Sequence, residues 1–236
     1  MQAADRLVIA ADLSSRDEIL RLVDELRGAV GVFKIGLQAF IANGPSLVRE
    51  IVATGEKVFL DLKIHDIPNT AGHAVAEAEA LGASIVTVHA SGGEAMLRAC
   101  AVVNPLAGRT RALVLGVTIL TSLDDADVAR IGFHGSAKES AVRLARLAKS
   151  AGLRGVVTSP REIAAIREAC GPELVILTPG IRPSGEAAGD QRRTMTPRDA
   201  ISAGADYIVI GRPITNAKSR REAALQIVDE MESVRA

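Results

Sequence analysis

The chain has 236 residues, of which 48% are hydrophobic, so it is long enough for one large α/β domain or two small ones with a substantial core. Its 28 basic and 28 acidic side chains balance, which excludes a strong global field for recruiting nucleic acid or an anionic membrane. Its apolar runs are too short to span a bilayer and its N-terminus lacks the layout of a signal peptide, so we expect a cytoplasmic protein.

Short β-rich runs alternate with amphipathic helical patterns along the chain. Most of the runs are continuous stretches of Val, Ile and Leu, which is typical of parallel strands covered on both faces. We expect strands, in chain order, over Leu7–Leu13, Val32–Leu37, Val58–Ile64, Ser84–His89, Leu113–Ile119, Gly155–Thr158, Leu174–Thr178 and Tyr207–Ile210. The helical patterns between them include Asp17–Arg27, Thr70–Leu81, Ala137–Ala151, Arg161–Ala169 and Ala217–Met231.

Eight strands at about thirty residues per βα unit predict an α/β fold of the (β/α)8 TIM barrel type. Small-residue turns such as Leu81-Gly82-Ala83 close helices and lead into the next strand. A doubly wound sheet is the alternative, but the first βα turn, Asp12-Leu13-Ser14-Ser15, lacks the glycines of a dinucleotide site. Because no linker interrupts the alternation, we expect a single barrel domain over residues 1–236.

Charged residues fall at the expected carboxyl ends of the first three strands, which is where the functional residues of a barrel lie. Asp12 ends the first strand, Lys34 lies within the second, and Asp61, Lys63 and Asp66 end the third. Asp61 and Lys63 are two residues apart on a strand, so their side chains share a face and can pair. Taken singly, Asp12 or Asp66 could cap the helix that follows it. Together the five charges indicate a network in a cleft.

The loops after the seventh and eighth strands have the composition of an anion site, and they form the usual phosphate site of this architecture. The seventh strand leads through Arg182 into a polar loop, 184–196, that contains Gln191. The eighth strand ends at Gly211, which would let backbone N–H groups approach an anion, and at Arg212, whose guanidinium offers a fixed fork of donors. A loop of about a dozen residues without its own helix is more often a functional lid than filler.

Several runs of the sequence carry a family resemblance: Ala-Asp-Leu at 11–13, Phe-Lys-Ile-Gly at 33–36, Asp-Leu-Lys-Ile-His-Asp-Ile-Pro-Asn-Thr at 61–70, Leu-Thr-Ser at 120–122, Thr-Pro-Gly-Ile-Arg at 178–182, Asp-Gln-Arg-Arg at 190–193 and Gly-Arg-Pro-Ile-Thr at 211–215. The run Asp-x-Lys-x-x-Asp alone is shared with a wider group of phosphate-binding barrels, but its extension Ile-Pro-Asn-Thr and the motif of the eighth strand are more specific. Together these runs resemble the orotidine 5′-phosphate decarboxylase family, and the resemblance covers essentially the whole chain.

The resemblance implies decarboxylation of orotidine 5′-phosphate to UMP in pyrimidine biosynthesis, without a metal or another cofactor. It implies that Lys63 protonates C6 of the pyrimidine and that Asp61 sits beside the departing carboxylate. Lys34 and Asp12 would hold the ribose hydroxyls and complete an alternating array of charges. The remaining implied roles are contact with the base for Thr121, a bridge between base and phosphate for Gln191, phosphate binding for Arg182, Gly211 and Arg212, and completion of the partner's site in a homodimer for Asp66 and Thr70.

The residue types suit this reaction on physical grounds. Decarboxylation leaves a carbanion at C6 with no adjacent electron sink, so the protein must stabilise the anion with fixed charges and then protonate it. A lysine flanked by carboxylates keeps its charged form, so Lys63 should retain a proton to deliver. Binding energy from the remote phosphate can close a loop over the site and hold Lys63 and Asp61 in place.

Two alternatives remain open. The nearer one is a metal-dependent sugar-phosphate decarboxylase or aldolase-like barrel, such as 3-keto-L-gulonate 6-phosphate decarboxylase, which shares Asp-x-Lys-x-x-Asp. Those barrels place an acidic residue on the second strand to help hold Mg²⁺, whereas Lys34 stands there in this chain and would repel a metal. Cys100 and Cys170 stand outside any metal spacing. The more distant alternative is a barrel that senses a nucleotide without turnover, and the presence of Lys63 disfavours it.

Overall fold

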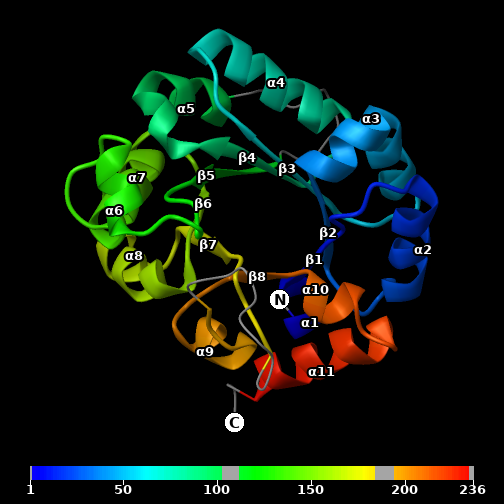
Figure 1. Ribbon diagram of the computed structural model, residues 1–236. Helices are drawn as coiled ribbons and strands as arrows, with labels where there is room; N and C mark the ends of the chain where they lie inside the picture. The colour runs from blue at the N-terminus through cyan, green and yellow to red at the C-terminus, as the bar shows by residue number, and fades with distance from the viewer. Residues whose placement is uncertain (1, 103–111, 184–193, 234–236) are drawn as a thin grey trace.

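Eight parallel strands close into a barrel in the order of the sequence, as Figure 1 shows in a view down the barrel. The computed structural model describes residues 2–102, 112–183 and 194–233. Each strand pairs with the next, and β8 pairs with β1 to close the ring. The predicted (β/α)8 barrel is therefore confirmed. Its strands are β1 (Leu7–Ala10), β2 (Val32–Gly36), β3 (Val58–Ile64), β4 (Ile85–His89), β5 (Leu113–Val117), β6 (Gly155–Val157), β7 (Val175–Thr178) and β8 (Tyr207–Ile210).

Helices surround the barrel and separate consecutive strands (Figure 1). Several begin at side chains that satisfy the free N–H groups of a first turn: Ser15 accepts from the backbone N–H of Glu18, and Ser136 forms a capping box with Glu139. In the described parts of the chain, none of the helices is long and apolar enough to cross a membrane. The helices are α1 (Ala3–Arg6), α2 (Arg16–Leu26), α3 (Leu37–Ala53), α4 (Pro68–Ala80), α5 (Gly93–Ala101), α6 (Asp125–Arg130), α7 (Ala137–Ser150), α8 (Ile163–Cys170), α9 (Pro197–Ser202), α10 (Arg212–Thr215) and α11 (Arg220–Glu232), with 3-10 turns at Ala90–Gly92 and Pro160–Glu162.

The buried apolar residues form two clusters because alternate side chains of a strand point to opposite faces. In β1, Leu7 and Ile9 belong to the larger cluster, which packs the strands against the helices. Val8 and Ala10 belong to the smaller one, which fills the barrel interior. The members of this inner cluster are Val8, Ala10, Val32, Phe59, Ile85, Leu115, Val117, Val157, Leu177 and Val209. The barrel is thus a packed core whose upper layer can serve as the floor of a site.

Several element boundaries differ from the expectation. The first strand ends at Ala10 rather than Leu13, since the N–H of Leu13 turns back to donate to the carbonyl of Ala11. The pattern 161–169 divides into a 3-10 turn and α8, and the last helix begins at Arg220 instead of Ala217. Asp12 consequently lies just beyond the strand.

Candidate active site

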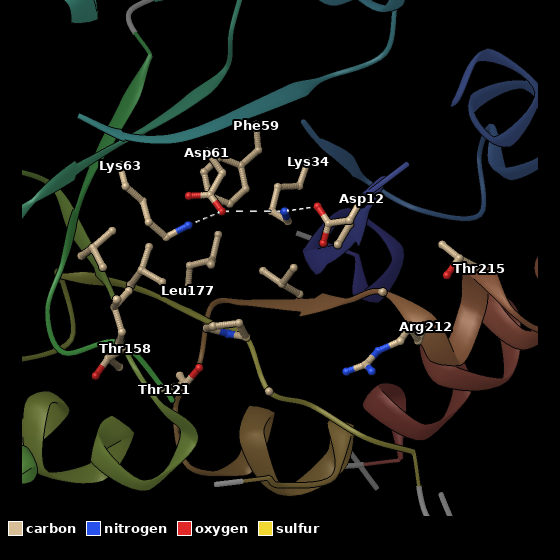
Figure 2. Close-up of a pocket in the computed structure, with 18 of the residues that line it drawn as sticks. Asp12, Lys34, Phe59, Asp61, Lys63, Thr121, Thr158, Leu177, Arg212 and Thr215 are labelled. Atoms are coloured by element: carbon tan, nitrogen blue, oxygen red, sulfur yellow. Dashed lines mark hydrogen bonds and ion pairs between the residues drawn. The ribbon is translucent and has the colours of Figure 1, made fainter. Parts of the chain in front are cut away.

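A cavity of about 510 Å³ opens at the carboxyl ends of the strands. Charged side chains from the ends of β1, β2 and β3 line one side, and residues that follow β5 to β8 line the other (Figure 2). Its apolar floor is the upper layer of the barrel interior, formed by Ala10, Phe59, Val117, Val157, Leu177 and Val209. The cavity therefore combines an apolar surface with a charged rim at the end of the barrel where the sequence places its chemistry.

Four of the five predicted charges form one alternating row, Asp12, Lys34, Asp61 and Lys63, which we call the charge row (Figure 2). The ammonium Nζ of Lys34 lies 2.8 Å from Oδ1 of Asp12 and 3.8 Å from Oδ2 of Asp61. The Nζ of Lys63 lies 2.8 Å from the same Oδ2. The middle of the row is the most buried, because the side chains of Lys34 and Asp61 are 11% and 12% exposed.

The charge row is neutral as a whole, which explains how the fold tolerates it. Buried charges are stable only when they are paired, and each member of the row is paired with a neighbour of opposite sign. The side chain of Lys63, at the end of the row, is 29% exposed and lines the cavity. A ligand in the cavity would therefore meet fixed charges of both signs in a site partly shielded from water, where they act more strongly than in solution.

The backbone that carries Lys63 is unusual. The pairing of β3 with β4 shifts between Leu60 and Ile64, and Lys63 has a φ of 52°, the one positive value among the non-glycine residues that the structure describes. Such a conformation is disfavoured for a lysine and tends to occur at functional sites. The N–H of Lys63 donates to Oγ1 of Thr87 at 3.0 Å, and this hydroxyl donates to Oδ1 of Asp61 at 2.9 Å.

Gly36, at the end of β2, leaves room for the charge row. A Cβ at this position would lie 2.9 Å from Nζ of Lys34 and 3.2 Å from Oδ1 of Asp12. Neither Gly36 nor Thr87 was among the site residues predicted from the sequence. The spacing of Gly36, two residues after Lys34 and hence on the same face of the strand, was a usable signal. A threonine inside an apolar strand carries no such signal.

The opposite side of the cavity is lined by the predicted phosphate ligands Arg182, Gly211 and Arg212 and by Thr121. Arg212 is exposed and begins α10, directly after β8. The N–H of Arg182 donates to the carbonyl of Met195 at 3.0 Å, which joins the chain on the two sides of the segment 184–193. Since β8 is the neighbour of β1, Arg212 follows the strand that lies beside the Asp12 end of the charge row.

The remaining predicted residues lie elsewhere. Asp66 and Thr70 are exposed in the β3–α4 segment and do not line the cavity, so Asp66 is not part of the charge row. Its Oδ1 accepts a hydrogen bond of 2.7 Å from the N–H of Ile67, itself 66% exposed. Gln191 lies outside the described residues. Lining residues that the sequence analysis did not assign include Leu13, Thr158, Pro179, Gly180, Thr215 and Asn216.

Two histidines lie beside the charged end of the site. His89 ends β4, and its ring lies 5.4 Å from that of His65. Burial, reinforced by the nearby His65 and Lys63, lowers the pKa of His89 below its ordinary value, so its neutral form is favoured. Neither ring lines the cavity. Across the described ranges, the His, Cys, Asp and Glu side chains nowhere gather in threes that could hold a metal ion.

Comparison with known proteins gives a consistent result over the full length. A sequence model described as the orotidine 5′-phosphate decarboxylase / HUMPS family matches residues 5–227. The orotidine 5′-phosphate decarboxylase of Moorella thermoacetica is 48% identical, with 100% of this chain and 95% of that protein covered. The enzyme of the same name from Geobacter sulfurreducens is also 48% identical, with 98% and 97% covered. The crystal structure of the orotidine 5′-phosphate decarboxylase from Lactobacillus acidophilus superposes with a TM-score of 0.85 at 33% identity, covering 95% of this chain and 98% of that one.

Proposed function

The chain belongs to the orotidine 5′-phosphate decarboxylase / HUMPS family, and from this premise we propose that it decarboxylates orotidine 5′-phosphate to UMP in pyrimidine biosynthesis. The family's description joins orotidine 5′-phosphate decarboxylase with a second name, HUMPS, but similar relatives from two organisms, each aligned over nearly the whole chain, carry the decarboxylase name. The observation that carries the proposal is the charge row beside a cavity whose far side presents arginines.

The order of these groups around the barrel matches the order of parts in a nucleotide. Lys63 and Asp61 lie on β3, and Lys34 lies on the neighbouring β2. Asp12 comes just after β1, and Arg212 comes just after β8, which closes the ring beside β1. A pyrimidine carboxylate placed at the β3 end puts the ribose near Lys34 and Asp12. The phosphate then reaches the arginines and Gly211, whose backbone can approach an anion closely. Thr121 lies on the far side from the charge row, where it can contact the base.

The chemistry follows from this placement. The bond from C6 to the carboxylate breaks, carbon dioxide leaves, and the electron pair stays on C6 as a carbanion. The ammonium of Lys63 stabilises that charge and then transfers a proton to C6, which gives UMP and a neutral amine that water reprotonates. Asp61 pairs with Lys63 at 2.8 Å and would face the substrate carboxylate, so its repulsion from that group is relieved as carbon dioxide departs.

The reaction needs no metal or organic cofactor, because the charge row supplies the fixed electrostatic field. The metal-dependent sugar-phosphate alternative fits less well, since the Oδ2 of Asp61 already faces two ammonium groups, at 2.8 and 3.8 Å. A divalent ion there would displace or repel both lysines.

The phosphate provides binding energy away from the bond that breaks. We infer that Arg182 and Arg212 grip the phosphate, and that Gln191, outside the described residues, bridges phosphate and base. The backbone N–H of Arg182 donates to the carbonyl of Met195, so Arg182 is already fixed to the chain beyond that segment. Binding energy from contacts with the phosphate can help to hold the reacting groups in place. Binding energy from the phosphate would thus be used at the charge row.

The protein acts as a homodimer in this proposal, with Asp66 and Thr70 completing the site of the partner subunit. Both residues are exposed, and the neighbouring Ile67 is apolar and 66% exposed, as a surface covered by a second copy would be.

A single barrel domain working in the cytoplasm completes the proposal. A family match that runs from 5 to 227 and two buried free thiols, Cys100 and Cys170, support it.

One assay tests the proposal directly: the ultraviolet absorbance of orotidine 5′-phosphate is followed with enzyme in the presence of EDTA. We expect substrate loss and formation of UMP with EDTA present. No turnover would refute the decarboxylase assignment, and turnover that EDTA abolishes would favour the metal-dependent alternative. Lys63→Ala, prepared in parallel, controls for contaminating host enzyme.

A further inference from the structure

We propose that Thr87, on β4, is the positioning residue that holds Asp61 and Lys63 in their working geometry, an inference that rests on the decarboxylase function. Thr87 is fully buried and does not line the cavity. It acts through the two residues of the charge row that stand at the reacting end.

The hydroxyl of Thr87 joins both residues at once. Its Oγ1 accepts the backbone N–H of Lys63 at 3.0 Å and donates to Oδ1 of Asp61 at 2.9 Å. The chemistry of the partners fixes these directions, because a backbone N–H can only donate and an ionised carboxylate can only accept. A threonine hydroxyl has one proton and two lone pairs, so it can serve both partners in one orientation.

The local irregularity of the barrel explains why a side chain is needed here. Between the pairs Leu60↔Val86 and Ile64↔Val88, β3 has three residues where β4 has one. The extra residues cannot continue a regular ladder, and the N–H of Lys63 bonds to a side chain of β4 instead. That bond supports the backbone of Lys63 at a φ of 52°, a conformation that a lysine does not favour by itself.

The two oxygens of the Asp61 carboxylate therefore have different partners. Its Oδ1 is held by Thr87, which leaves Oδ2 for the ammonium of Lys63 at 2.8 Å and for that of Lys34 at 3.8 Å. Lys63 is consequently held at both ends, by its backbone through Thr87 and by its ammonium through Asp61 (Figure 2 shows the latter contact). Losing the hydroxyl would free the carboxylate to rotate and the backbone of Lys63 to relax.

The test compares four side chains at position 87. Thr87→Val keeps the shape but removes the hydroxyl, and we expect kcat to fall about 100-fold, as for a catalytic group misplaced by about 1 Å. Binding of UMP should change less than about threefold, because the phosphate and ribose contacts remain. Thr87→Ser should restore most of kcat. Thr87→Ala completes a second pair, because the Ser and Ala variants both lack the methyl group and differ only in the hydroxyl.

Thr178→Val is the matched control. Thr178 is also fully buried in a strand, and its Oγ1 donates to the carbonyl of Thr158 at 2.9 Å. This substitution also removes one buried hydroxyl from the barrel, but none that touches the charge row. We expect a comparable loss of stability and a kcat close to that of the unmodified protein.

A crystal structure of Thr87→Val gives a readout that does not depend on activity. The proposal expects Lys63 to leave its positive φ, or Asp61 to rotate away from Lys63. An unchanged geometry would overturn the proposal even if the unmodified protein has no decarboxylase activity, a result that would refute the proposed function separately. Equal kcat for the Ser and Ala variants, or an equal loss of kcat in Thr178→Val, would also overturn it.

Discussion

Replacing Gly36 by alanine should damage catalysis while leaving the fold intact. Gly36 has a φ of −91° and a ψ of −175°, an extended conformation that alanine adopts freely. The difficulty is space, because the new Cβ would stand 2.9 Å from Nζ of Lys34 and 3.2 Å from Oδ1 of Asp12. The atom most severely crowded is the end of a flexible side chain, so it can yield without moving the backbone.

The size of the effect follows from these distances. A relaxed contact needs about 3.5 Å, so the ammonium of Lys34 must move by roughly 0.6 Å or more. That movement disturbs its 2.8 Å contact with Asp12 and its 3.8 Å separation from Asp61. Since a misplacement of about 1 Å can cost about 100-fold, we expect kcat/KM to fall by about ten- to a hundredfold. The melting temperature should shift by less than about 4 °C, which corresponds to roughly 1 kcal/mol in a protein of this size.

The measurement is kcat/KM for orotidine 5′-phosphate, with the melting temperature recorded for the same preparations. Gly72→Ala is the matched control, because its Cβ would meet the carbonyl oxygen of Ala99 at an ordinary 3.4 Å, and its three nearest atoms all belong to Ala99 rather than to the charge row. This control should retain full activity. If Gly36→Ala had the same kcat/KM as the unmodified protein, the charge row would tolerate a displacement of Lys34 and the reasoning would be wrong.

Four further predictions use other parts of the site. Lys63→Ala should lower kcat by about 10²- to 10⁴-fold while UMP still binds, and calorimetry that found UMP binding lost as well would contradict a role confined to the reacting end. Arg212→Ala should lower kcat/KM for orotidine 5′-phosphate by about 10- to 150-fold but hardly affect unphosphorylated orotidine; an equal loss for both substrates would exclude Arg212 as a phosphate ligand. Lys63→Ala and Asp66→Asn subunits, each nearly inactive, should recover roughly a quarter of full activity after subunit exchange, because half of the dimers are hybrids with one intact site. Recovery without exchange, or none after confirmed exchange, would contradict a shared site. Burial and the nearby His65 lower the pKa of His89 below its ordinary 6.5, so the unfolded state takes up the proton first and stability should fall as the pH drops below that value. Urea unfolding at about pH 7.5 and pH 5.5 should show a smaller pH dependence for His89→Asn than for the unmodified protein.

Much of the barrel was predictable because strands buried on both faces appear in the sequence as continuous apolar runs. The bounds of β3 and β8 agree with the expected Val58–Ile64 and Tyr207–Ile210. The first strand was overextended because an apolar residue, Leu13, follows Asp12, whereas a strand ends where its neighbours stop pairing with it. The helix α3 was missed since Gly44, at a φ of 67°, and Pro45 interrupt its pattern with a kink that packing tolerates.

The charge row was predictable in composition but not in geometry. A two-residue spacing placed Asp61 and Lys63 on one face of a strand, and the structure pairs them at 2.8 Å. The same argument could not locate Thr87, because its contact with Lys63 depends on where the register of β3 against β4 shifts. Such a shift is a property of two strands together. Asp66 was expected in the same network, but β3 ends at Ile64, so Asp66 lies beyond the strand and the spacing argument does not apply to it.

Charged residues at the two ends of the barrel differ in what satisfies them, and this difference separates function from stability. At the amino-terminal end, the Oδ2 of Asp206 accepts bonds from Arg167 at 2.9 Å and from the backbone of Ile176 at 2.8 Å. Arg167 also donates to four backbone carbonyls, so this pair is used to tie together loops that would otherwise leave polar groups buried. At the carboxyl end, the side chains of Lys34 and Lys63 are paired with carboxylates that line the same cavity. Charged side chains that are bonded to backbone groups have little freedom to act on a ligand. Charged side chains that are paired with one another beside a cavity can change their pairing when a charge on the ligand appears and then disappears. A decarboxylation that removes a carboxylate and creates a carbanion is a reaction of that kind.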